Sequence, residues 1–292
     1  MWPMHFLSPK LRRRNEQLLI KVMFHRVLIL LFVCACWSMG RAEEVQAQHA
    51  RVELVSRQTS FAPGQENLLG VHFSLEKDWH IYWINPGDSG QPPVLHWQLP
   101  AGFNAGEIQW PHPEKLQKGS LADYGYNGQV TLLVPVRVSK SYQGNANAEI
   151  GLQARWLICR EVCIPDHVQL RLTLSSGGAP AEDQKHSALF TETQKLLPQP
   201  WPRSWKAHVA SEKDTFILSV QTGKAIPKAE FFPLEANQIE NAAPQTVKTT
   251  SQGAEITMSK SDQLLKPISN LKGVLVLADG NAYQIQASVT QH

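Results

Sequence analysis

The sequence WLICREVCIPD, residues 156–166, contains Cys159 and Cys163, the two cysteines of this chain that lie outside its N-terminal leader. Along one extended strand, a separation of four residues is about 13 Å, which is too long for a disulfide. The sulfur atoms can therefore meet only if the chain reverses between them or winds one helical turn. Pro165 disfavours a continuing helix, because it pushes the residue before it toward extended geometry.

The residues on both sides of this stretch alternate between apolar and polar side chains. A period of two is typical of a strand with one buried face. The apolar positions are Ile150, Leu152, Ala154 and Trp156 before the cysteines, and Val168, Leu170, Leu172 and Leu174 after them. The pattern predicts a β-hairpin whose tip carries two facing cysteines.

A disulfide between Cys159 and Cys163 would close a very short ring. Loop-closure arithmetic for five residues gives about 2 kcal/mol of stabilisation, near the low end for a cross-link. A short ring at a hairpin tip is also exposed and easily reduced. The residues therefore favour a redox-active pair, with a structural disulfide as the alternative.

Residues 1–42 have the features of a secretory signal peptide. A basic segment precedes an apolar run of eleven residues, 27–37, and Gly40-Arg41-Ala42 places small residues at the −3 and −1 positions of a cleavage site. Eleven residues are fewer than the roughly twenty that span a bilayer, so we expect cleavage rather than anchoring. Met23 directly precedes a more compact version of the same signal, which makes it a possible true start.

Removal of this leader would change the charge of the protein. The whole chain has a formal net charge of +3, but the leader holds seven Lys or Arg residues and one Glu, which leaves 21 basic and 24 acidic residues. The basic charge therefore belongs to the leader and does not indicate a nucleic-acid partner. No later stretch is long and apolar enough to span a membrane. These features predict a soluble, exported protein located in the periplasm.

Residues 43–176 consist of short strand patterns separated by turn signals, without a convincing helix, which predicts an all-β domain of sandwich type. The clearest strand is 130–138, where Pro135 indicates an edge strand. Residues 177–204 are predicted as a linker with a helix over 181–197, ended by three prolines. Residues 205–292 are predicted as a second, smaller β-rich domain that binds a partner or supports the first domain.

Five motifs of the first domain form a recognisable combination. They are WHIYWINPGDSG (79–90), LPAGF (99–103), IQWP (108–111), YGY (124–126) and WLICREVCIP (156–165). This combination resembles the N-terminal periplasmic domain of the thiol–disulfide reductase DsbD, and more closely its ScsB-type relatives. The resemblance covers about residues 51–176, and the later region resembles the additional β-domain of the ScsB-type proteins more weakly.

The resemblance implies an immunoglobulin-like β-sandwich in which Cys159 and Cys163 are the redox pair of a thiol–disulfide oxidoreductase that needs no cofactor. In that family the pair accepts electrons from a thioredoxin-like domain and passes them to exported proteins that contain disulfides. A cap loop covers the disulfide until a partner docks, and its counterpart here is expected around residues 110–122. DsbD spaces its cysteines more widely, so the family does not indicate which sulfur is attacked first.

The resemblance also implies a donor on another polypeptide. The membrane-embedded electron conduit and the thioredoxin-like domain of the family have no counterpart in this sequence. We therefore expect a thioredoxin-like protein or a DsbD-type membrane protein as the electron donor, and exported disulfide-containing proteins as the acceptors.

Four further residues are candidates for an assisting role. Trp110, Tyr124 and Tyr126 could shield the disulfide, although aromatic residues of this kind also fill sandwich cores. Asp123 could assist proton transfer, or it could simply be a turn aspartate.

Two other functions are compatible with the residues. Cys159, Cys163 and His167 could supply ligands for Cu(I) or zinc, but Pro165 opposes the single helix that would align all three. The chain could instead be a non-catalytic adaptor whose disulfide only fastens a hairpin.

Overall fold

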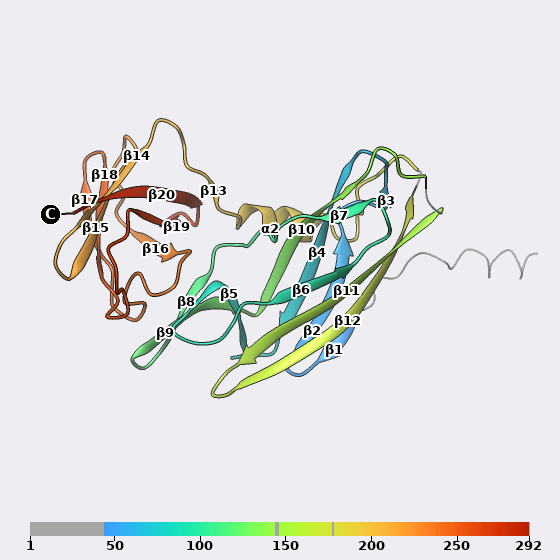
Figure 1. Cartoon of the computed structure of the whole chain (residues 1–292), viewed down its shortest axis with the longest axis horizontal. Helices are drawn as coiled ribbons and strands as arrows, with labels where there is room; N and C mark the ends of the chain where they lie inside the picture. The colour runs from blue at the N-terminus through green and yellow to red at the C-terminus, as the bar shows by residue number, and fades with distance from the viewer. Residues whose placement is uncertain (1–43, 144–145, 177, 292) are drawn as a thin grey trace, which may run out of the picture. The chain divides into compact units, whose positions relative to one another are not determined.

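The computed structural model describes residues 44–143, 146–176 and 178–291 (Figure 1). The predicted signal peptide, residues 1–42, lies outside this part of the chain. The described residues are mostly strand and form two β regions, with one short helix between them. This arrangement confirms the predicted all-β class, in which a β-sandwich is followed by a short helical linker and a second β-rich part.

The first β region contains two sheets. The five-stranded sheet has the order β1 (Glu44–Ala47), β2 (Ala50–Ser56), β4 (Glu66–Leu75), β10 (Gln129–Val138) and β7 (Phe103–Ala105). The seven-stranded sheet has the order β3 (Ser60–Phe61), β12 (Cys163–Ser176), β11 (Asn147–Cys159), β5 (His80–Gly87), β9 (Leu121–Asn127) and β8 (Glu114–Lys118), and β6 (Val94–Gln98) also pairs with β11.

The core of the first region lies between these two sheets. Alternate residues of β11 are buried from Ala148 to Ile158. Phe73 of β4 packs edge-to-face against Trp156 of β11, with ring centroids 5.2 Å apart. Ile81 and Trp83 of β5 also belong to this core. Since side chains alternate along a strand, the residues between them point to the opposite face of the sheet.

The longest hairpin of the region joins β11 and β12 (Figure 1). Its pairing is continuous from Asn147↔Ser175 to Cys159↔Cys163, and Arg160–Val162 make the turn. The predicted hairpin with two facing cysteines is therefore confirmed. Cys159 also pairs with His80 of β5, so the tip is attached to the middle of the sheet.

The prediction that Pro135 marks an edge strand is wrong. Strand β10 lies between β4 and β7. However, its ladder with β7 covers only Val136–Val138, and the carbonyl of Pro135 accepts a hydrogen bond from the Gly106 N–H at the end of that ladder. The missing N–H of the proline therefore falls where the ladder stops, which is a position that proline tolerates.

The helix of the linker, α2 (Ser187–Lys195), is shorter than the predicted 181–197. The residues before it are held by the first region, because Ala181 O accepts from Thr59 N and Asp183 N donates to Arg57 O. Backbone groups used in this way cannot join the helical ladder. The helix is anchored by Phe190, which is buried beside Val55 and Leu133 on the outer side of the five-stranded sheet.

The second β region is one sheet that follows the helix. Its strand order is β16 (Ala229–Pro233), β19 (Asn270–Leu277), β20 (Ala282–Gln291), β14 (Lys206–Ser211), β15 (Thr215–Gln221), β18 (Gly253–Ser259) and β17 (Thr246–Thr250), and β13 (Gln199–Pro200) also pairs with β20. The expected turn at Asp279–Asn281 joins β19 and β20, and Gly280 has a positive φ of 82° there.

The two β regions share part of one core. The second region has its own cluster around Phe216, Leu218 and Ile256. Its Phe232 and Val274, however, pack with the core of the first region. The ring of Phe232 lies edge-on to Tyr124, with centroids 5.2 Å apart. The second region therefore contacts the strands that carry the cysteine-proximal residues described next.

Replacement of Phe190 tests the anchoring of α2. Phe190→Ala should lower the free energy of unfolding by about 3–5 kcal/mol, the usual cost of a cavity left by a large buried ring. Leu196→Ala, at a side chain that is 46% exposed at the end of the same helix, should change it by less than about 0.5 kcal/mol. Denaturant unfolding measures both, and equal effects would contradict the anchoring role.

Candidate redox site

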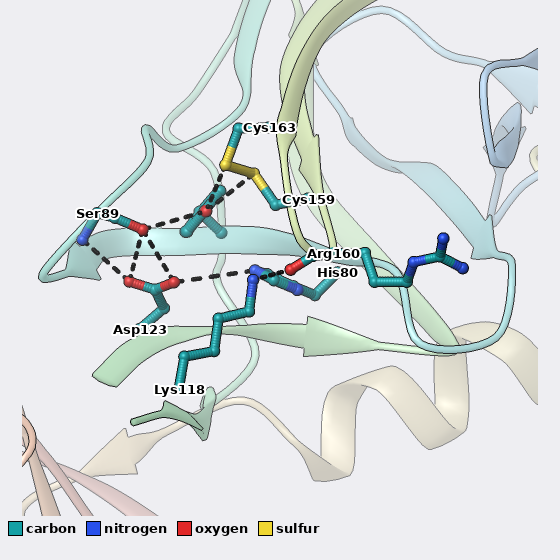
Figure 2. Close-up of a disulfide and its surroundings, with 8 residues drawn as sticks. His80, Ser89, Lys118, Asp123, Cys159, Arg160 and Cys163 are labelled. Carbon is teal, nitrogen blue, oxygen red and sulfur yellow. Dashed lines mark hydrogen bonds and ion pairs between the residues drawn. A yellow bond between two sulfur atoms is a disulfide. The ribbon is translucent and has the colours of Figure 1, made fainter. Parts of the chain in front are cut away.

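The site is built around the disulfide between Cys159 and Cys163 (Figure 2). The two sulfur-bearing residues differ in accessibility, because Cys159 is fully buried and Cys163 is exposed. Thiol–disulfide exchange needs a free line of approach to the attacked sulfur. Of the two residues, Cys163 is therefore the more accessible to an external thiol.

Tyr82 of β5 faces both sulfur atoms. Its hydroxyl donates a hydrogen bond to Cys159 Sγ at 2.9 Å and lies 3.3 Å from Cys163 Sγ. The side chain is fully buried, and burial raises the pKa of the phenol. Gly90 has a φ of 76°, and a Cβ at that position would overlap the Tyr82 ring. Glycine therefore lets the loop after β5 lie directly on the tyrosine.

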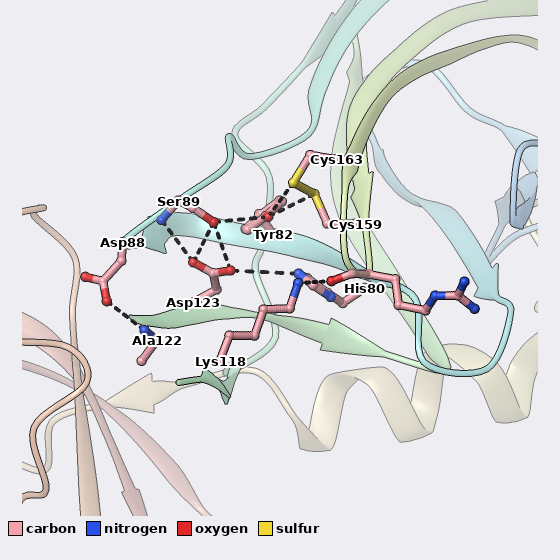
Figure 3. A network of polar contacts seen from close by, with 10 residues as sticks. His80, Tyr82, Asp88, Ser89, Lys118, Ala122, Asp123, Cys159 and Cys163 are labelled. Atoms are coloured by element: carbon pink, nitrogen blue, oxygen red, sulfur yellow. Dashed lines mark hydrogen bonds and ion pairs between the residues drawn. A yellow bond between two sulfur atoms is a disulfide. The ribbon is translucent and has the colours of Figure 1, made fainter. Parts of the chain in front are cut away.

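Ser89 and Asp123 continue the network behind Tyr82 (Figure 3). Ser89 Oγ lies 3.5 Å from the Tyr82 hydroxyl and 2.9 Å from each carboxylate oxygen of Asp123. The Ser89 N–H also donates to Asp123 at 2.9 Å. Asp123 is 2% exposed and lies within strand β9, so its alternative assignment as a turn aspartate is wrong. Burial raises the pKa of Asp123, and the hydrogen bonds from Ser89 oppose this shift.

His80 is the buried neighbour of this network. Its Nε2 lies 3.9 Å from Asp123 Oδ2 and has no hydrogen-bond partner. Burial, with a smaller contribution from the charge of Lys118, lowers the pKa of His80 to about 4. The ring is therefore neutral at pH 7 and does not form an ion pair with Asp123.

Lys118 joins the tip of the β8–β9 hairpin to the tip of the cysteine hairpin. Its ammonium group donates to the backbone carbonyl of Arg160 (Figure 2). Lys118 falls inside the segment 110–122 in which a cap loop is expected. The guanidinium of Arg160 lies 5.1 Å from the ring centre of Trp79, and Figure 2 shows this side chain directed away from the disulfide.

The remaining predicted aromatic residues make contacts elsewhere. Trp110 packs against the core of the first region and lines a groove together with Trp83 and Trp201. The Tyr124 hydroxyl donates to Asn241 Oδ1, and the Tyr126 hydroxyl donates to the carbonyl of Pro111. Of the four assisting candidates, Asp123 is therefore the one in the network that reaches the sulfur atoms.

The proposed metal ligands do not converge. His167 is exposed on β12 and pairs with Arg155. Four residues of extended strand separate it from Cys163, which is about 13 Å. The part of the chain that the structure describes contains no group of three His, Cys, Asp or Glu residues placed to hold a metal. With the disulfide formed, this structure therefore does not bring Cys159, Cys163 and His167 together as a copper or zinc site.

Four residues of the site were not singled out from the sequence: His80, Tyr82, Ser89 and Lys118. Three of them belong to the motif WHIYWINPGDSG (79–90), where dense turn chemistry directly follows a strand. The concentration of turn residues after this strand could have indicated the site, since an apolar strand that ends in Gly, Asp and Ser places polar groups at the edge of a core.

Comparisons with known proteins agree with this geometry. The family model for the N-terminal part of the thiol:disulfide interchange protein DsbD matches residues 51–175. This part of the chain is similar to the N-terminal domain of DsbD. This DsbD-type domain carries the Cys159–Cys163 disulfide, and the combination is consistent with thiol–disulfide interchange.

A solved structure shows the same fold. The N-terminal periplasmic domain of ScsB from Proteus mirabilis is similar with a TM-score of 0.61 and 16% identity, covering 84% of this chain and 94% of that chain. The YadV chaperone (10% identity, TM-score 0.21, covering 80% and 98%) and the periplasmic chaperone SfaE (9%, 0.23, 82% and 100%) are too dissimilar in structure to carry an argument. The search of the curated proteins gave no match.

No helix among the described residues has the length and apolar character needed to cross a bilayer.

The acid dependence of stability tests the environment of His80. Because the pKa of His80 falls from 6.5 to about 4 on folding, the unfolded chain binds a proton that the folded chain rejects. The free energy of unfolding is therefore unaffected by His80 above pH 6.5. It falls by about 3 kcal/mol as the pH drops from 6.5 toward 4. His80→Gln should reduce this loss of unfolding free energy, measured by denaturant unfolding at pH 7, 5 and 4.

His96→Gln is the matched control, because His96 is exposed on β6. It should leave the difference in unfolding free energy between pH 7 and pH 4 unchanged. A His80→Gln variant with the full acid loss would contradict the buried, neutral histidine.

Proposed function

We propose that this chain is a periplasmic thiol–disulfide exchange module, which relays electrons through Cys159 and Cys163 from a thioredoxin-like donor to exported proteins that contain disulfides. The observation that carries the proposal is the geometry of the pair. The exposed residue Cys163 is bonded to the fully buried Cys159, and the Tyr82 hydroxyl lies within hydrogen-bond distance of both sulfur atoms. The family of residues 51–175 supports the same chemistry.

The first half of the exchange reduces the disulfide. A thiolate of the reduced donor attacks Cys163 Sγ, the Cys159–Cys163 bond breaks, and Cys159 leaves as a thiolate. The donor's second thiolate then attacks its own sulfur in the mixed disulfide, and Cys163 leaves as a thiolate. The donor is oxidised to a disulfide, and two electrons reach this chain, which then holds Cys159 and Cys163 as two thiolates.

The second half passes the electrons on. The exposed Cys163 thiolate attacks a disulfide of the exported protein and forms a second mixed disulfide. Cys159 then attacks Cys163, which restores the internal disulfide and releases the reduced acceptor. The burial of Cys159 suits this resolving role, because Cys159 needs to reach only Cys163.

Tyr82 stabilises the leaving group in the first step. A hydrogen bond to a charged acceptor is stronger than one to a neutral acceptor, so the bond from Tyr82 to Cys159 gains strength as negative charge develops on the sulfur. Ser89 and Asp123 orient the hydroxyl. Because its pKa is raised, Asp123 is also suited to supply a proton along the series Asp123, Ser89 and Tyr82.

The donor and acceptors are expected on other polypeptides outside the cytoplasm. The signal-peptide features of residues 1–42 support export. The similar ScsB domain is periplasmic, which supports the same location for this chain.

Trapping with single cysteine variants tests the order of attack. Cys159→Ser leaves the exposed Cys163 thiol, which should capture a thioredoxin-like protein whose resolving cysteine has been removed. Cys163→Ser leaves the buried Cys159. Its yield of captured thioredoxin-like protein should be at least about tenfold lower, since reactivity follows the access of the thiol. Non-reducing gels measure both yields, with the double serine variant as the blank. Better capture by Cys159 would reverse the proposed order.

The redox potential separates a relay from a structural disulfide in an adaptor. Equilibration in dithiothreitol buffers, followed by thiol trapping, should give a potential above about −300 mV for an exchange pair. A potential below that range, together with no capture by either variant, would favour the adaptor.

Removal of the Tyr82 hydroxyl tests the proposed leaving-group stabilisation. Tyr82→Phe should slow reduction by dithiothreitol by about 10- to 100-fold, the effect expected from losing a hydrogen bond to a charged group. The rate is measured by acid quench and thiol alkylation. Tyr142→Phe is the control, because Tyr142 packs against Phe103 and not against the cysteines. An unchanged rate in Tyr82→Phe would exclude the hydroxyl from the exchange step.

A further inference from the structure

The second β region holds the two segments that carry Ser89 and Asp123. These residues, which lie behind Tyr82, belong to the loop after β5 and to strand β9. Their immediate neighbours in sequence, Asp88 and Tyr124, both hydrogen-bond to one side chain of the second region, Asn241. Asn241 contacts neither Tyr82 nor the sulfur atoms through these bonds, so any influence on the exchange passes through the adjacent residues.

The two bonds of Asn241 use its amide in opposite senses. Its Nδ2 donates to Asp88 Oδ1 at 2.7 Å, and its Oδ1 accepts from the Tyr124 hydroxyl at 2.9 Å. An ionised carboxylate can only accept, so the amide has one orientation that satisfies both partners. Asn241 is 7% exposed, and a mismatched polar group at this depth would be costly.

Asp88, which Asn241 contacts, belongs to the loop after β5 and also hydrogen-bonds to strand β9. Its second carboxylate oxygen accepts from the Ala122 N–H at 2.6 Å (Figure 3), and its own N–H donates to the Ala122 carbonyl at 3.1 Å. A Cβ at Gly87 would overlap that same carbonyl oxygen, which shows how closely the loop and β9 approach. One carboxylate therefore connects the loop, the strand and the second region.

A bulge in β5 gives the second region a further point of attachment. Between Tyr82 and Gly87 the register with β9 shifts, because five steps along β5 correspond to only two steps from Gly125 to Asp123. Asn85 lies in this bulge, is 3% exposed and donates to the carbonyl of Pro233 at 2.8 Å. Bulges of this kind redirect the side chains that follow them.

From these contacts we propose that Asn241 is a positioning residue of the redox site, holding Asp88 and Tyr124 so that Ser89 and Asp123 keep the Tyr82 hydroxyl on the sulfur of Cys159. The inference rests on the exchange chemistry proposed above and assigns the second β region a part in it. The region acts as a rigid support of the site, since its contacts fix backbone positions next to both network residues.

An isosteric substitution tests the proposal. Asn241→Asp keeps the shape of the side chain but places a carboxylate against that of Asp88. It should slow reduction by dithiothreitol at pH 7 by about three- to tenfold, as expected for neighbouring groups that are energetically coupled. Far-UV circular dichroism and the unfolding midpoint are recorded for every variant.

Exchanging the side chains of residues 88 and 241 should restore the rate of reduction. In Asp88→Asn/Asn241→Asp, the new amide can donate to the new carboxylate and accept from Ala122 N–H, and the carboxylate can still accept from Tyr124. This double variant should return the rate to within about twofold of the original chain, because each hydrogen bond of the cluster has a donor and an acceptor again. A double variant as slow as Asn241→Asp would overturn the proposal.

A double-mutant cycle separates positioning from general destabilisation. If Asn241 acts through Tyr82, Asn241→Asp should have an effect below about 1.5-fold in a Tyr82→Phe background, since the effects of coupled residues do not add. Equal effects in both backgrounds, or no effect in either, would overturn the proposal. Gln245→Glu is the matched control, because the amide of Gln245 also makes two hydrogen bonds in the second region, and both go to the backbone of Phe231.

These measurements do not depend on the biological partner. If dithiothreitol reduction responds as expected while no thioredoxin-like protein is captured, the positioning role stands and the proposed relay fails. If capture succeeds and the rates are insensitive to Asn241, the relay stands and the positioning role fails.

Discussion

The register between β11 and β12 is the constraint on which the redox site depends. The apolar residues of β11 face the core, and a slip of one residue would turn them all to the opposite face. The register that buries them also places Cys159 directly opposite Cys163 at the turn and beside His80 of β5. The energy that sets the position of the sulfur atoms is therefore the burial of side chains far along the hairpin, and the short disulfide ring adds little to it.

The site lies on the face of the seven-stranded sheet opposite to the core. Ile81, Trp83 and Tyr124 belong to the core, and the intervening Tyr82 and Asp123 point the other way. A polar network on that face can be buried only if another segment covers it, because unpaired polar groups in a low-dielectric environment are unfavourable. The loop after β5 provides this cover through Ser89 and Gly90. The second β region contacts this covering segment in turn, because Asn241 donates to Asp88 and Asn85 donates to the carbonyl of Pro233.

Accessibility and chemistry are divided between the two cysteines. Cys163 is exposed at a turn, whereas Cys159 is buried under Tyr82. The proposed exchange uses this division, since an external thiol would attack Cys163 while the Tyr82 hydroxyl, a preorganised donor, stabilises the charge that develops on Cys159. The contact of Lys118 with the Arg160 carbonyl ties a neighbouring hairpin to the same tip, so the approach to Cys163 is shaped by two turns and not by one.

The amino-acid sequence by itself determined the local features: the strands, the hairpin with facing cysteines, the linker with its helix and the second β-rich part. Alternation with a period of two and the turn residues are local signals, and burial of one face enforces them. Only the tertiary structure decided that Tyr82 meets the sulfur atoms with Ser89 and Asp123 behind it, and that Asn241 hydrogen-bonds to the neighbours of these two residues. Alternation places Tyr82 and Asp123 on the outer faces of their strands, but it does not show that β5 lies between β11 and β9. For the same reason Pro135 was misassigned to an edge and Asp123 to a turn: strand order and loop cover are decided by contacts between residues far apart in the chain, which no local pattern records.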